Sequence, residues 1–450
     1  MSNTDTLFQA VEAARERILA AERHLWANPE SGYREWKTHA YMLQQFTLLG
    51  YTVTEAGNIP GFYVDVDTER PGPTLGIFAE MDALIIPSHP ESDPDTGAVH
   101  ACGHHCQCAA MLGIAAALKA PGALEELCGR IRLIVVPAEE LIEIRFRHEL
   151  KAQGIIRYCG GKQEFLYRGY LDDVDLSMMV HTSSSGIYGA NRGSNGCVIK
   201  EAAFSGKSAH AGGSPHMGIN ALYAANCGMQ VANALRETFR DEDHIRFHPI
   251  ITQGGDVVNA IPDCVTVESY VRGASMEAIA RESEKINRAF AGTAAAMGCG
   301  LQLKDEHGYA PRTNDALMRD AFYQTGKLLF AEEDMAFTED WGTGCSDMGD
   351  VSCIMPAVHP YIGGAQGQSH GSQYRITDPV LACVTSAKVQ CGVAAYLLAN
   401  GAEKANEIVA GFTGRFQSPR AYLAWVDQTC FEGECVSYND DGTITLTYKN

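Results

Sequence analysis

A chain of 450 residues is long enough for more than one hydrophobic core, so two domains are the default expectation. Its net charge of −20 argues against nucleic acid and anionic membrane surfaces as partners, because both carry negative charge themselves. Apolar residues make up 46% and charged residues 20% of the chain, as in ordinary globular proteins. We therefore expect a globular protein that binds neither nucleic acid nor membranes.

The fifteen cysteines are odd in number and irregularly spaced, unlike the cysteines of a disulfide framework. The N-terminal residues resemble an amphipathic helix with charges throughout, not a secretory signal. No apolar run approaches the ~20 residues of a membrane span. Reduced thiols in the cytoplasm are the simplest explanation of this pattern, and we expect a cytoplasmic protein.

The first part of the chain alternates between helical and strand patterns. Apolar spacing predicts helices over 4–28 and 35–49. Apolar strands are expected in the runs YTVTEA, FYVDVDT, TLGIFAEMDAL, GRIRLIVVPAEE and LSMMVH. Because such strands are separated by helices, they predict an α/β fold with a mostly parallel sheet covered on both faces.

Around residue 196 the pattern changes to β-α-β-β-α-β, which is the order of a ferredoxin-like α+β unit. We expect residues 196–308 to form a small inserted domain. Residues 1–195 and 309–450 would then form the larger α/β domain. The last residues predict a hairpin with Asp-Asp-Gly at its turn.

A cluster of histidine and cysteine follows the third predicted strand. In HACGHHCQC, which begins at His100, six of nine residues are His or Cys. Thiolate and imidazole bind borderline-soft divalent metals well. Each residue alone is more often a core residue, and we interpret Cys106 and Cys108 as core of the following helix. Cys102 and His104 together favour a metal site.

Three predicted strands end in residues that suit acid–base or metal chemistry. Asp82 follows one strand, Glu139 and Glu140 follow a second, and His181 ends a third. In open α/β sheets, sites are built at the carboxyl ends of the strands. At a strand end, adjacent side chains point in different directions, so one glutamate can bind a metal while its neighbour faces a bound water.

One further histidine, His370, lies far downstream in the glycine-rich run GGAQGQSHG. A two-metal hydrolytic site needs several N, O or S ligands and open positions for water. The candidate ligands of such a site are Cys102, His104, Glu140, His181 and His370.

Eight stretches resemble the M20 family of metallopeptidases and amidohydrolases, nearest its aminobenzoyl-glutamate and N-acyl-amino-acid hydrolase branch. They run in the family's order from 77 to 370: AEMDALIIP, HACGHH with its helix, VVPAEE, MMVH, FSGKSAHAGGSPHMGINAL, GGDVVNAIPD, SDMGDVS and IGGAQGQSHG. The resemblance implies a phosphorylase/hydrolase-like catalytic domain. It also implies that the inserted domain is a lid and dimerisation domain, and that the protein is a homodimer.

The same resemblance implies a role for each candidate residue. Cys102 would bridge two ions, Glu139 would be the general base, and Asp82 would orient a ligand or the base. The metal ligands would be Cys102, His104, Glu140, His181 and His370. In the inserted domain, His210 would steady the oxyanion in the partner's active site. Asn259 and Arg272 would hold a substrate carboxylate.

Two positions depart from the family pattern. The branch commonly has Asp or Asn where this chain has His105, which leaves the hydrogen bonding beside His104 open. The peptidase branch has His two residues before the Asp at position 82, where this chain has Glu80. His104 would then serve as the ligand instead.

The sequence predicts a metal-dependent amidohydrolase with two divalent ions, a metal-bridging water and a glutamate base. Zinc is the ion we favour, with manganese and cobalt as alternatives. Its substrate would be a small N-acyl or N-aminoacyl amino acid, similar to aminobenzoyl-glutamate or a dipeptide. The alternatives are a structural-zinc protein, a non-catalytic metal- or ligand-binding protein on the same scaffold, and an enzyme with Cys102 as nucleophile.

Overall fold

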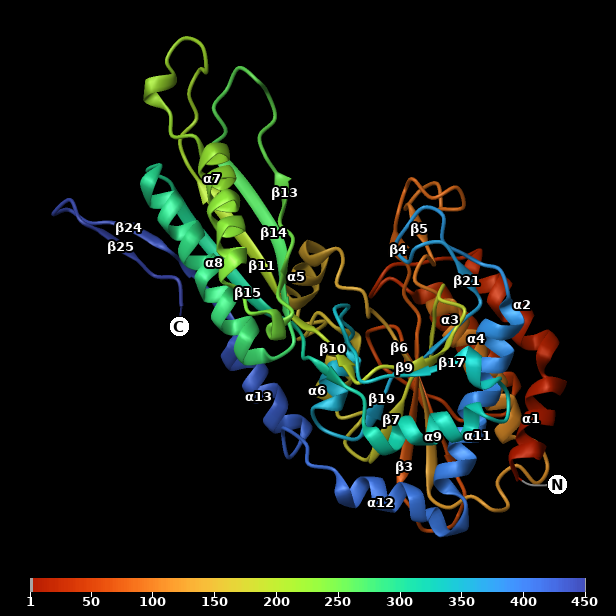
Figure 1. Cartoon of the computed structure of the whole chain (residues 1–450). Helices are drawn as coiled ribbons and strands as arrows, with labels where there is room; N and C mark the ends of the chain where they lie inside the picture. The colour runs from red at the N-terminus through yellow and green to blue at the C-terminus, as the bar shows by residue number, and fades with distance from the viewer. Residues whose placement is uncertain (1–2, 450) are drawn as a thin grey trace. The chain divides into compact units, whose positions relative to one another are not determined.

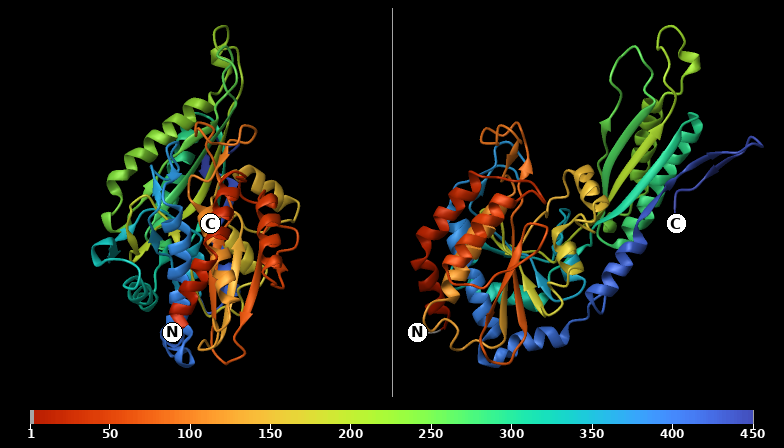
Figure 2. Two further views of the ribbon diagram at one scale, coloured as in Figure 1. Left: turned by 90° about the vertical axis from the view of Figure 1, so that its right-hand side faces the viewer. Right: turned by 180° about the vertical axis from the view of Figure 1, so that it is seen from behind.

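The computed structural model describes residues 3–449, which divide into two compact units. Unit 1 comprises the chain up to Gly193, Arg312–Trp341 and Ser346–Tyr422. Unit 2 comprises Ser194–Pro311, Gly342–Cys345 and the chain from Leu423 onward. Figures 1 and 2 show the elements of each unit, which are described separately below.

The N-terminal helical region of unit 1 is broken, although the sequence predicted one helix over 4–28. Helix α1 (Asn3–Ala13) ends at Ala14, and α2 (Arg15–Trp26) follows at once. Leu7 and Val11 of α1 and Ile18 of α2 are fully buried, so both helices contribute an apolar face to the core. Helix α3 (Trp36–Leu48) lies within the second predicted range.

A six-stranded sheet lies at the centre of unit 1, in the order β1-β2-β6-β3-β7-β19. Strands β3, β6, β7 and β19 pair in parallel, whereas β2 pairs antiparallel with β6 and β1 antiparallel with β2. The mostly parallel sheet predicted from the apolar runs is therefore present. Its strands are β1 (Thr54–Glu55), β2 (Phe62–Asp67), β3 (Thr74–Glu80), β6 (Arg130–Val136), β7 (Leu176–Met178) and β19 (Ala357–Val358).

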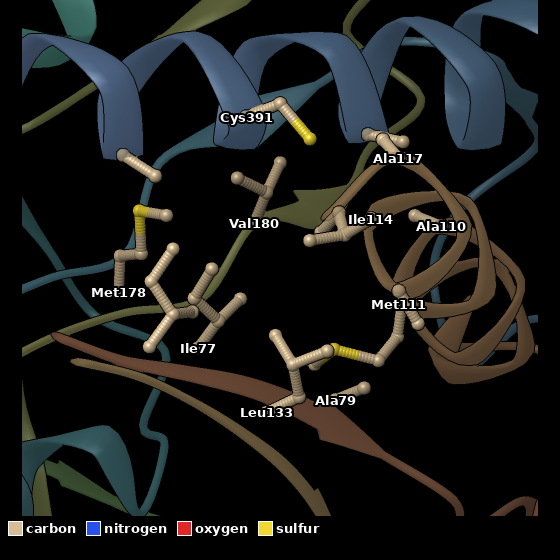
Figure 3. Packing of buried hydrophobic residues seen from close by; sticks show 14 of the residues in the cluster. Ile77, Ala79, Ala110, Met111, Ile114, Ala117, Leu133, Met178, Val180 and Cys391 are labelled. Atoms are coloured by element: carbon tan, nitrogen blue, oxygen red, sulfur yellow. The ribbon is translucent and has the colours of Figure 1, made fainter. Parts of the chain in front are cut away.

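Two apolar helices, α4 (His104–Leu118) and α11 (Ser386–Leu398), cover this sheet. Figure 3 shows Met111 and Ile114 of α4 facing Ala79 of β3 and Leu133 of β6, with Cys391 of α11 nearby. These side chains are essentially fully buried. The core thus fixes the start of α4, where His104 lies, against the carboxyl end of β3.

One helical stretch, Val380–Leu398, is long and apolar enough to cross a membrane by length and composition alone. It joins the π-helical turn η5 (Val380–Thr385) to α11. The sequence had indicated no such run. Because 72% of the stretch is buried inside the structure, it is accounted for as a core helix.

The remaining elements of unit 1 are short strands and peripheral helices. The strands are β4 (Leu84–Ile85), β5 (Ala98–Val99), β8 (His181–Thr182), β9 (Tyr188–Ala190), β16 (Arg312–Thr313), β17 (Met335–Phe337), β20 (Tyr361–Ile362), β21 (Ala365–Gln366) and β22 (Arg375–Ile376). The helices are α5 (Ile144–Ala152), α6 (Gly161–Tyr167), α9 (Ala316–Gly326), α10 (Met348–Ser352) and α12 (Glu403–Gly411). Strands β10 (Gly193–Ser194) and β18 (Trp341–Gly342) and helix α13 (Pro419–Thr429) lie where the chain passes from one unit to the other.

Unit 2 has the predicted β-α-β-β-α-β order, with its second strand split into β12 and β13. The sheet runs β12-β14-β11-β15-β23, with β13 also paired to β14, and all pairs are antiparallel. Helices α7 and α8 lie side by side against it (Figure 1). The elements are β11 (Gly196–Ser205), α7 (Ala221–Ala234), β12 (Arg246–Phe247), β13 (Ile250–Gln253), β14 (Cys264–Gly273), α8 (Met276–Ala296) and β15 (Gly300–Tyr309).

The C-terminal residues pack with unit 2, although the sequence assigned the whole of 309–450 to the larger domain. Strand β23 (Phe431–Glu434) pairs with β15, whose backbone groups would otherwise form an open sheet edge. The predicted hairpin follows as β24 (Val436–Tyr438) and β25 (Ile444–Leu446). Cys435 and Val436 are buried in the unit 2 core, which anchors the tail there.

Candidate metal centre

Gly103 sets the backbone between two candidate ligands, Cys102 and His104. Its φ is +90°, a left-handed conformation that glycine adopts without strain. A Cβ there would lie 2.6 Å from Oη of Tyr374, so a side chain would also clash. His370 lies in the left-handed region as well, at φ +64°, an uncommon conformation for a non-glycine residue and one that occurs at functional sites.

The five candidate ligands, all in unit 1, fall into two overlapping sets. Cys102, His104 and His181 have ligand atoms within 4.8 Å of one another, and so do Cys102, Glu140 and His370. The Sγ of Cys102 lies 3.5 Å from Nε2 of His181, and Nε2 of His370 lies 3.1 Å from Oε1 of Glu140. Cys102 belongs to both sets, which is the geometry that a bridging ligand requires.

The orientation of His104 is set by Asp82. Nδ1 of His104 lies 3.0 Å from Oδ1 of Asp82 and 3.0 Å from its carbonyl oxygen. The other ring nitrogen, Nε2, is buried and lies 3.2 Å from a carboxylate oxygen of Glu80. The second carboxylate oxygen of Asp82 accepts a hydrogen bond from the backbone N–H of Glu140 at 2.8 Å. Asp82 thus orients two candidate ligands and leaves Nε2 of His104 directed away from it, as a metal ligand requires.

The thiol of Cys102 has an environment that favours its ionised form. Burial and the charge of Glu140 oppose ionisation, but His104 and His181 outweigh them and hold the pKa of Cys102 well below its usual range. Burial likewise opposes protonation of His181, and the Cys102 sulfur outweighs it and raises the pKa of this histidine. A thiolate among imidazoles is a donor set suited to borderline-soft divalent ions.

Glu139 lies beside both sets but has a different environment from Glu140. It is 7% exposed, and one of its carboxylate oxygens is 4.0 Å from Nε2 of His104. Burial, followed by the charges of Glu80, Glu140 and Asp347, raises the pKa of Glu139 well above its ordinary value. A carboxylate with a raised pKa is a stronger base, which suits a general base.

Three fully buried charges lie against this site, and of these the sequence had singled out only Glu80. Nζ of Lys162 on α6 lies 2.5 Å from Oε1 of Glu80 and 2.5 Å from Oδ1 of Asp347. The other oxygen of Glu80 lies 3.2 Å from Nε2 of His104. Asp347 belongs to one of the family-like stretches, but nothing in the local sequence distinguishes Lys162 from a surface lysine.

His105, the departure noted beside His104, points away from the candidate ligands. Its Nε2 lies 3.4 Å from Sγ of Cys106 and 3.5 Å from Oε1 of Glu22. Burial opposes its protonation, but Cys106 and Glu22 raise its pKa to about 9. Cys106 and Cys108 are fully buried on α4, as the sequence predicted.

The three candidate substrate-contacting residues all belong to unit 2. His210 and Asn259 lie in adjacent segments, because the N–H of Ala211 donates to the carbonyl oxygen of Asn259 at 2.9 Å. Both side chains are exposed. Asn259 precedes β14, which begins at Cys264, whereas Arg272 is near the far end of that strand. At about 3.4 Å per residue, the strand puts roughly 27 Å between Cys264 and Arg272.

Comparison with known proteins shows which proteins this chain is similar to. Residues 189–297 match the peptidase dimerisation domain of M20 proteins. The chain is 28% identical to Xaa-Arg dipeptidase of Mus musculus over 380 residues, covering 81% of each. It is 28% identical to a p-aminobenzoyl-glutamate hydrolase chain of Escherichia coli K12 over 276 residues, covering 58% of each.

A solved structure has the same fold. It is a Bacillus subtilis protein described as a dinuclear metal binding peptidase from the M20 family. It aligns with a TM-score of 0.63 and 22% identity, covering 86% of this chain and 99% of its own. The chain thus carries an M20 peptidase dimerisation domain and is similar, over most of its length, to hydrolases that act on amide bonds.

Proposed function

We propose that this protein is a dinuclear metal-dependent amidohydrolase acting on an N-acyl or N-aminoacyl amino acid, similar to aminobenzoyl-glutamate or a dipeptide. The observation that carries the proposal is the pair of three-residue sets that share Cys102, with Glu139 beside them. The relatives named as a dipeptidase and an aminobenzoyl-glutamate hydrolase support this substrate class.

Cys102, His104, Glu140, His181 and His370 would hold two divalent ions, with Cys102 as the shared ligand. Zinc is the ion that a thiolate and three imidazoles favour, and manganese and cobalt are the alternatives. When bound, two such ions would lower the pKa of a water from 15.7 towards about 7 and polarise the amide carbonyl. Asp82 would keep Nε2 of His104 directed at the ion through the contacts at Nδ1.

Glu139 would carry the proton during turnover. Its raised pKa makes its carboxylate basic enough to accept a proton from the attacking water. The same carboxyl would then deliver that proton to the leaving nitrogen, so that the amine departs neutral. Because Glu139 is largely buried, bulk water competes little for this proton.

His210, Asn259 and Arg272 would contact the substrate, a role that rests on the family resemblance. Arg272 offers a planar fork for a carboxylate, and His210 a donor for a developing oxyanion. Within one chain, most of β14 lies between Asn259 and Arg272. In a homodimer, His210 would reach the partner's active site. The match to a dimerisation domain supports this arrangement.

The surface of unit 2 offers apolar groups for such a dimer. Tyr223 and Val231 on α7 are 60% and 44% exposed, and Ile250 and Ile251 on β13 are 62% and 37% exposed. Within the described part of the chain, strand β13 pairs only with β14, so its other edge keeps backbone groups open to a partner strand. We propose that α7 and β13 form the homodimer interface.

A reducing compartment such as the cytoplasm fits the thiols. All fifteen cysteines lie within the described residues, and none of them forms a disulfide. Cysteines that stay as thiols are typical of proteins kept reduced. We propose a cytoplasmic location on this basis.

The experiment that tests the function combines metal analysis with a substrate panel. The purified protein is assayed on N-acyl amino acids, dipeptides and aminobenzoyl-glutamate, with and without a chelator. The proposal expects about two ions per chain and turnover that the chelator abolishes and added metal restores. One inert ion without turnover would instead favour a structural zinc protein. Bound metal without turnover on any substrate would favour the non-catalytic binding protein.

A further inference from the structure

Arg312, on strand β16 of unit 1, is a buried cation without an anionic partner. The residue is 1% exposed, and neither Nε nor Nη1 has a hydrogen-bond partner. Nη2 makes one long contact, 3.4 Å to Oδ1 of Asn191. Among the described residues, no ion pair of the guanidinium with a carboxylate is found.

Other buried arginines of unit 1 show how this chain usually satisfies such a group. Arg132 is 3% exposed and contacts the carboxylates of Asp65 and Asp173. Arg147 is fully buried and donates to the carbonyl oxygens of Cys159 and Glu140. An unpaired buried charge is costly, so an unsatisfied guanidinium at this depth indicates that its partner is a ligand.

The position of Arg312 relates it to the metal centre. Its Cζ lies 5.8 Å from the ring centroid of Tyr361. That ring lies 5.7 Å from the ring of His181 and 5.0 Å from the ring of His359. Strand β20 pairs with β8 so that Tyr361 stands opposite His181. One aromatic ring therefore separates the guanidinium from a proposed metal ligand.

The groups around Arg312 are neutral or cationic. Nδ1 of His359 is a second buried polar atom without a partner, and the His359 ring stacks on that of His181 at 5.6 Å. Asn314 connects the segments that contain His359 and Asn191. Its Oδ1 accepts a hydrogen bond from the N–H of His359, and its Nδ2 donates one to the carbonyl oxygen of Asn191. A carboxylate is the ligand that a fork of unsatisfied N–H groups binds best.

We propose that Arg312 binds a carboxylate of the amide substrate, as an anion subsite of unit 1 beside His181. The inference rests on the proposed function and deepens it, because it adds to Arg272 a second arginine, in unit 1, that recognises a carboxylate of the released amino acid. The carboxylate is either the α-carboxylate or an acidic side chain of the released amino acid.

The test compares acid and amide substrates in the metal-loaded wild type and in Arg312→Gln. N-acyl-glutamate is set against N-acyl-glutamine, which lacks the side-chain charge, and against the α-amide of N-acyl-glutamate, which lacks the α-carboxylate. We expect R312Q to lower kcat/KM about 10- to 100-fold for N-acyl-glutamate. We expect little change for the analogue that lacks the recognised carboxylate, which identifies its source.

Control variants separate binding from structure. Arg192→Gln removes an exposed arginine that stacks on Trp341 at 5.4 Å and should leave all three substrates unchanged. Arg312→Lys keeps the positive charge but not the planar fork, so we expect an intermediate loss of kcat/KM for the acid substrate. This variant replaces R312Q in the comparison if R312Q does not fold. An equal slowing of acid and amide substrates by both Arg312 variants, or no slowing, would overturn the proposal.

A binding measurement distinguishes failure of the anion subsite from failure of the proposed function. If the wild type hydrolyses none of the substrates, calorimetry with glutamate, glutamine and glutamate α-amide still tests the subsite. Wild type should then bind glutamate at least 10-fold more tightly than R312Q does, with no such difference for one of the amides. Equal binding by both proteins, including no binding by either, would contradict the anion subsite.

Discussion

The Sγ of Cys102 lies 3.5 Å from Nε2 of His181, although 79 residues separate them along the chain. Cys102 is also within 4.8 Å of the ligand atoms of Glu140 and His370, so one thiol joins two candidate metal sets. We expect Cys102→Ala to lose most bound metal from both sets, with activity reduced in proportion. Metal content per chain by mass spectrometry measures this.

Cys391 provides the matched control for that variant. It is fully buried on α11 and belongs to the apolar core. Cys391→Ala removes the same atoms away from the candidate ligands and should keep full metal content. Equal metal content in the two variants would show that Cys102 is not a shared ligand.

Glu139→Gln tests the general base. The amide is nearly isosteric with the carboxyl but cannot accept the proton, so we expect kcat to fall about 100- to 10,000-fold. Metal content should not change, because Glu140 and not Glu139 is the proposed ligand. Steady-state kinetics and metal analysis measure both effects, with the exposed Glu149→Gln as a control. Turnover near the wild-type rate would refute the assignment.

Asp347→Asn tests the electrostatic origin of the raised pKa of Glu139. Burial is its largest cause, and the negative charges of Glu80, Glu140 and Asp347 raise it further. A base works in its deprotonated form, so kcat/KM should fall as the pH drops through this raised pKa. Removing one negative neighbour lowers that pKa, and the acid limb of the profile should move to lower pH. A shift to higher pH, or none, would contradict the electrostatic cause.

Lys162→Met tests the buried network of charges behind the site. Lys162, Glu80 and Asp347 are all fully buried, and removing the ammonium leaves two carboxylates without their cation. Losing one partner of such a pair typically costs about 3–5 kcal/mol of unfolding free energy. Urea denaturation measures the loss. Adding Asp347→Asn to Lys162→Met should recover part of it, because one unpaired charge is then removed.

The exposed pair Lys404–Glu407 is the control for this stability measurement. The two groups lie 3.0 Å apart, and both side chains are more than half exposed. We expect Lys404→Met to leave the urea midpoint unchanged, since solvent screens such pairs. Similar midpoints for the Lys162 and Lys404 variants would mean that the buried network adds little to stability.

Ile250→Glu tests the proposed dimer interface. Ile250 is 62% exposed on β13, so the new charge costs little in a monomer but would be buried in a dimer. We expect a shift from dimer to monomer in analytical ultracentrifugation, with loss of turnover if the partner supplies His210. Leu48→Glu changes an equally exposed residue, 67%, on α3 and should leave the dimer intact. A dimeric I250E protein would exclude β13 from the interface.

Much of the fold could be predicted because the apolar patterns are local. The parallel strands are buried on both faces and appear as continuous apolar runs, and the unit 2 order follows from alternating helix and strand periods. The break between α1 and α2 was missed because the apolar stripe continues through Ala14. The position of β23 was missed because a strand pairs where a sheet has an unpaired edge, and the local sequence does not show where that edge is.

That several of the candidate ligands lie close together could be predicted, because they follow strands or open a helix at the carboxyl edge of the central sheet. The burial of Lys162 and Arg312 could not be predicted from the sequence. Both look like surface residues in sequence, and only the folded chain shows that they are buried, one between two carboxylates and the other without a partner. The residues around Lys162 and Arg312 come from distant segments of the chain, so no spacing pattern in the local sequence indicates these contacts.

The central claim is that five side chains of one unit hold two ions through a shared thiolate. Anomalous X-ray scattering from crystals of the zinc-loaded protein tests it most directly. We predict two anomalous peaks per chain, each about 2.3 Å from Sγ of Cys102, with His104 and His181 on one ion and Glu140 and His370 on the other. A single peak, or two peaks of which one lies away from Cys102, would contradict it.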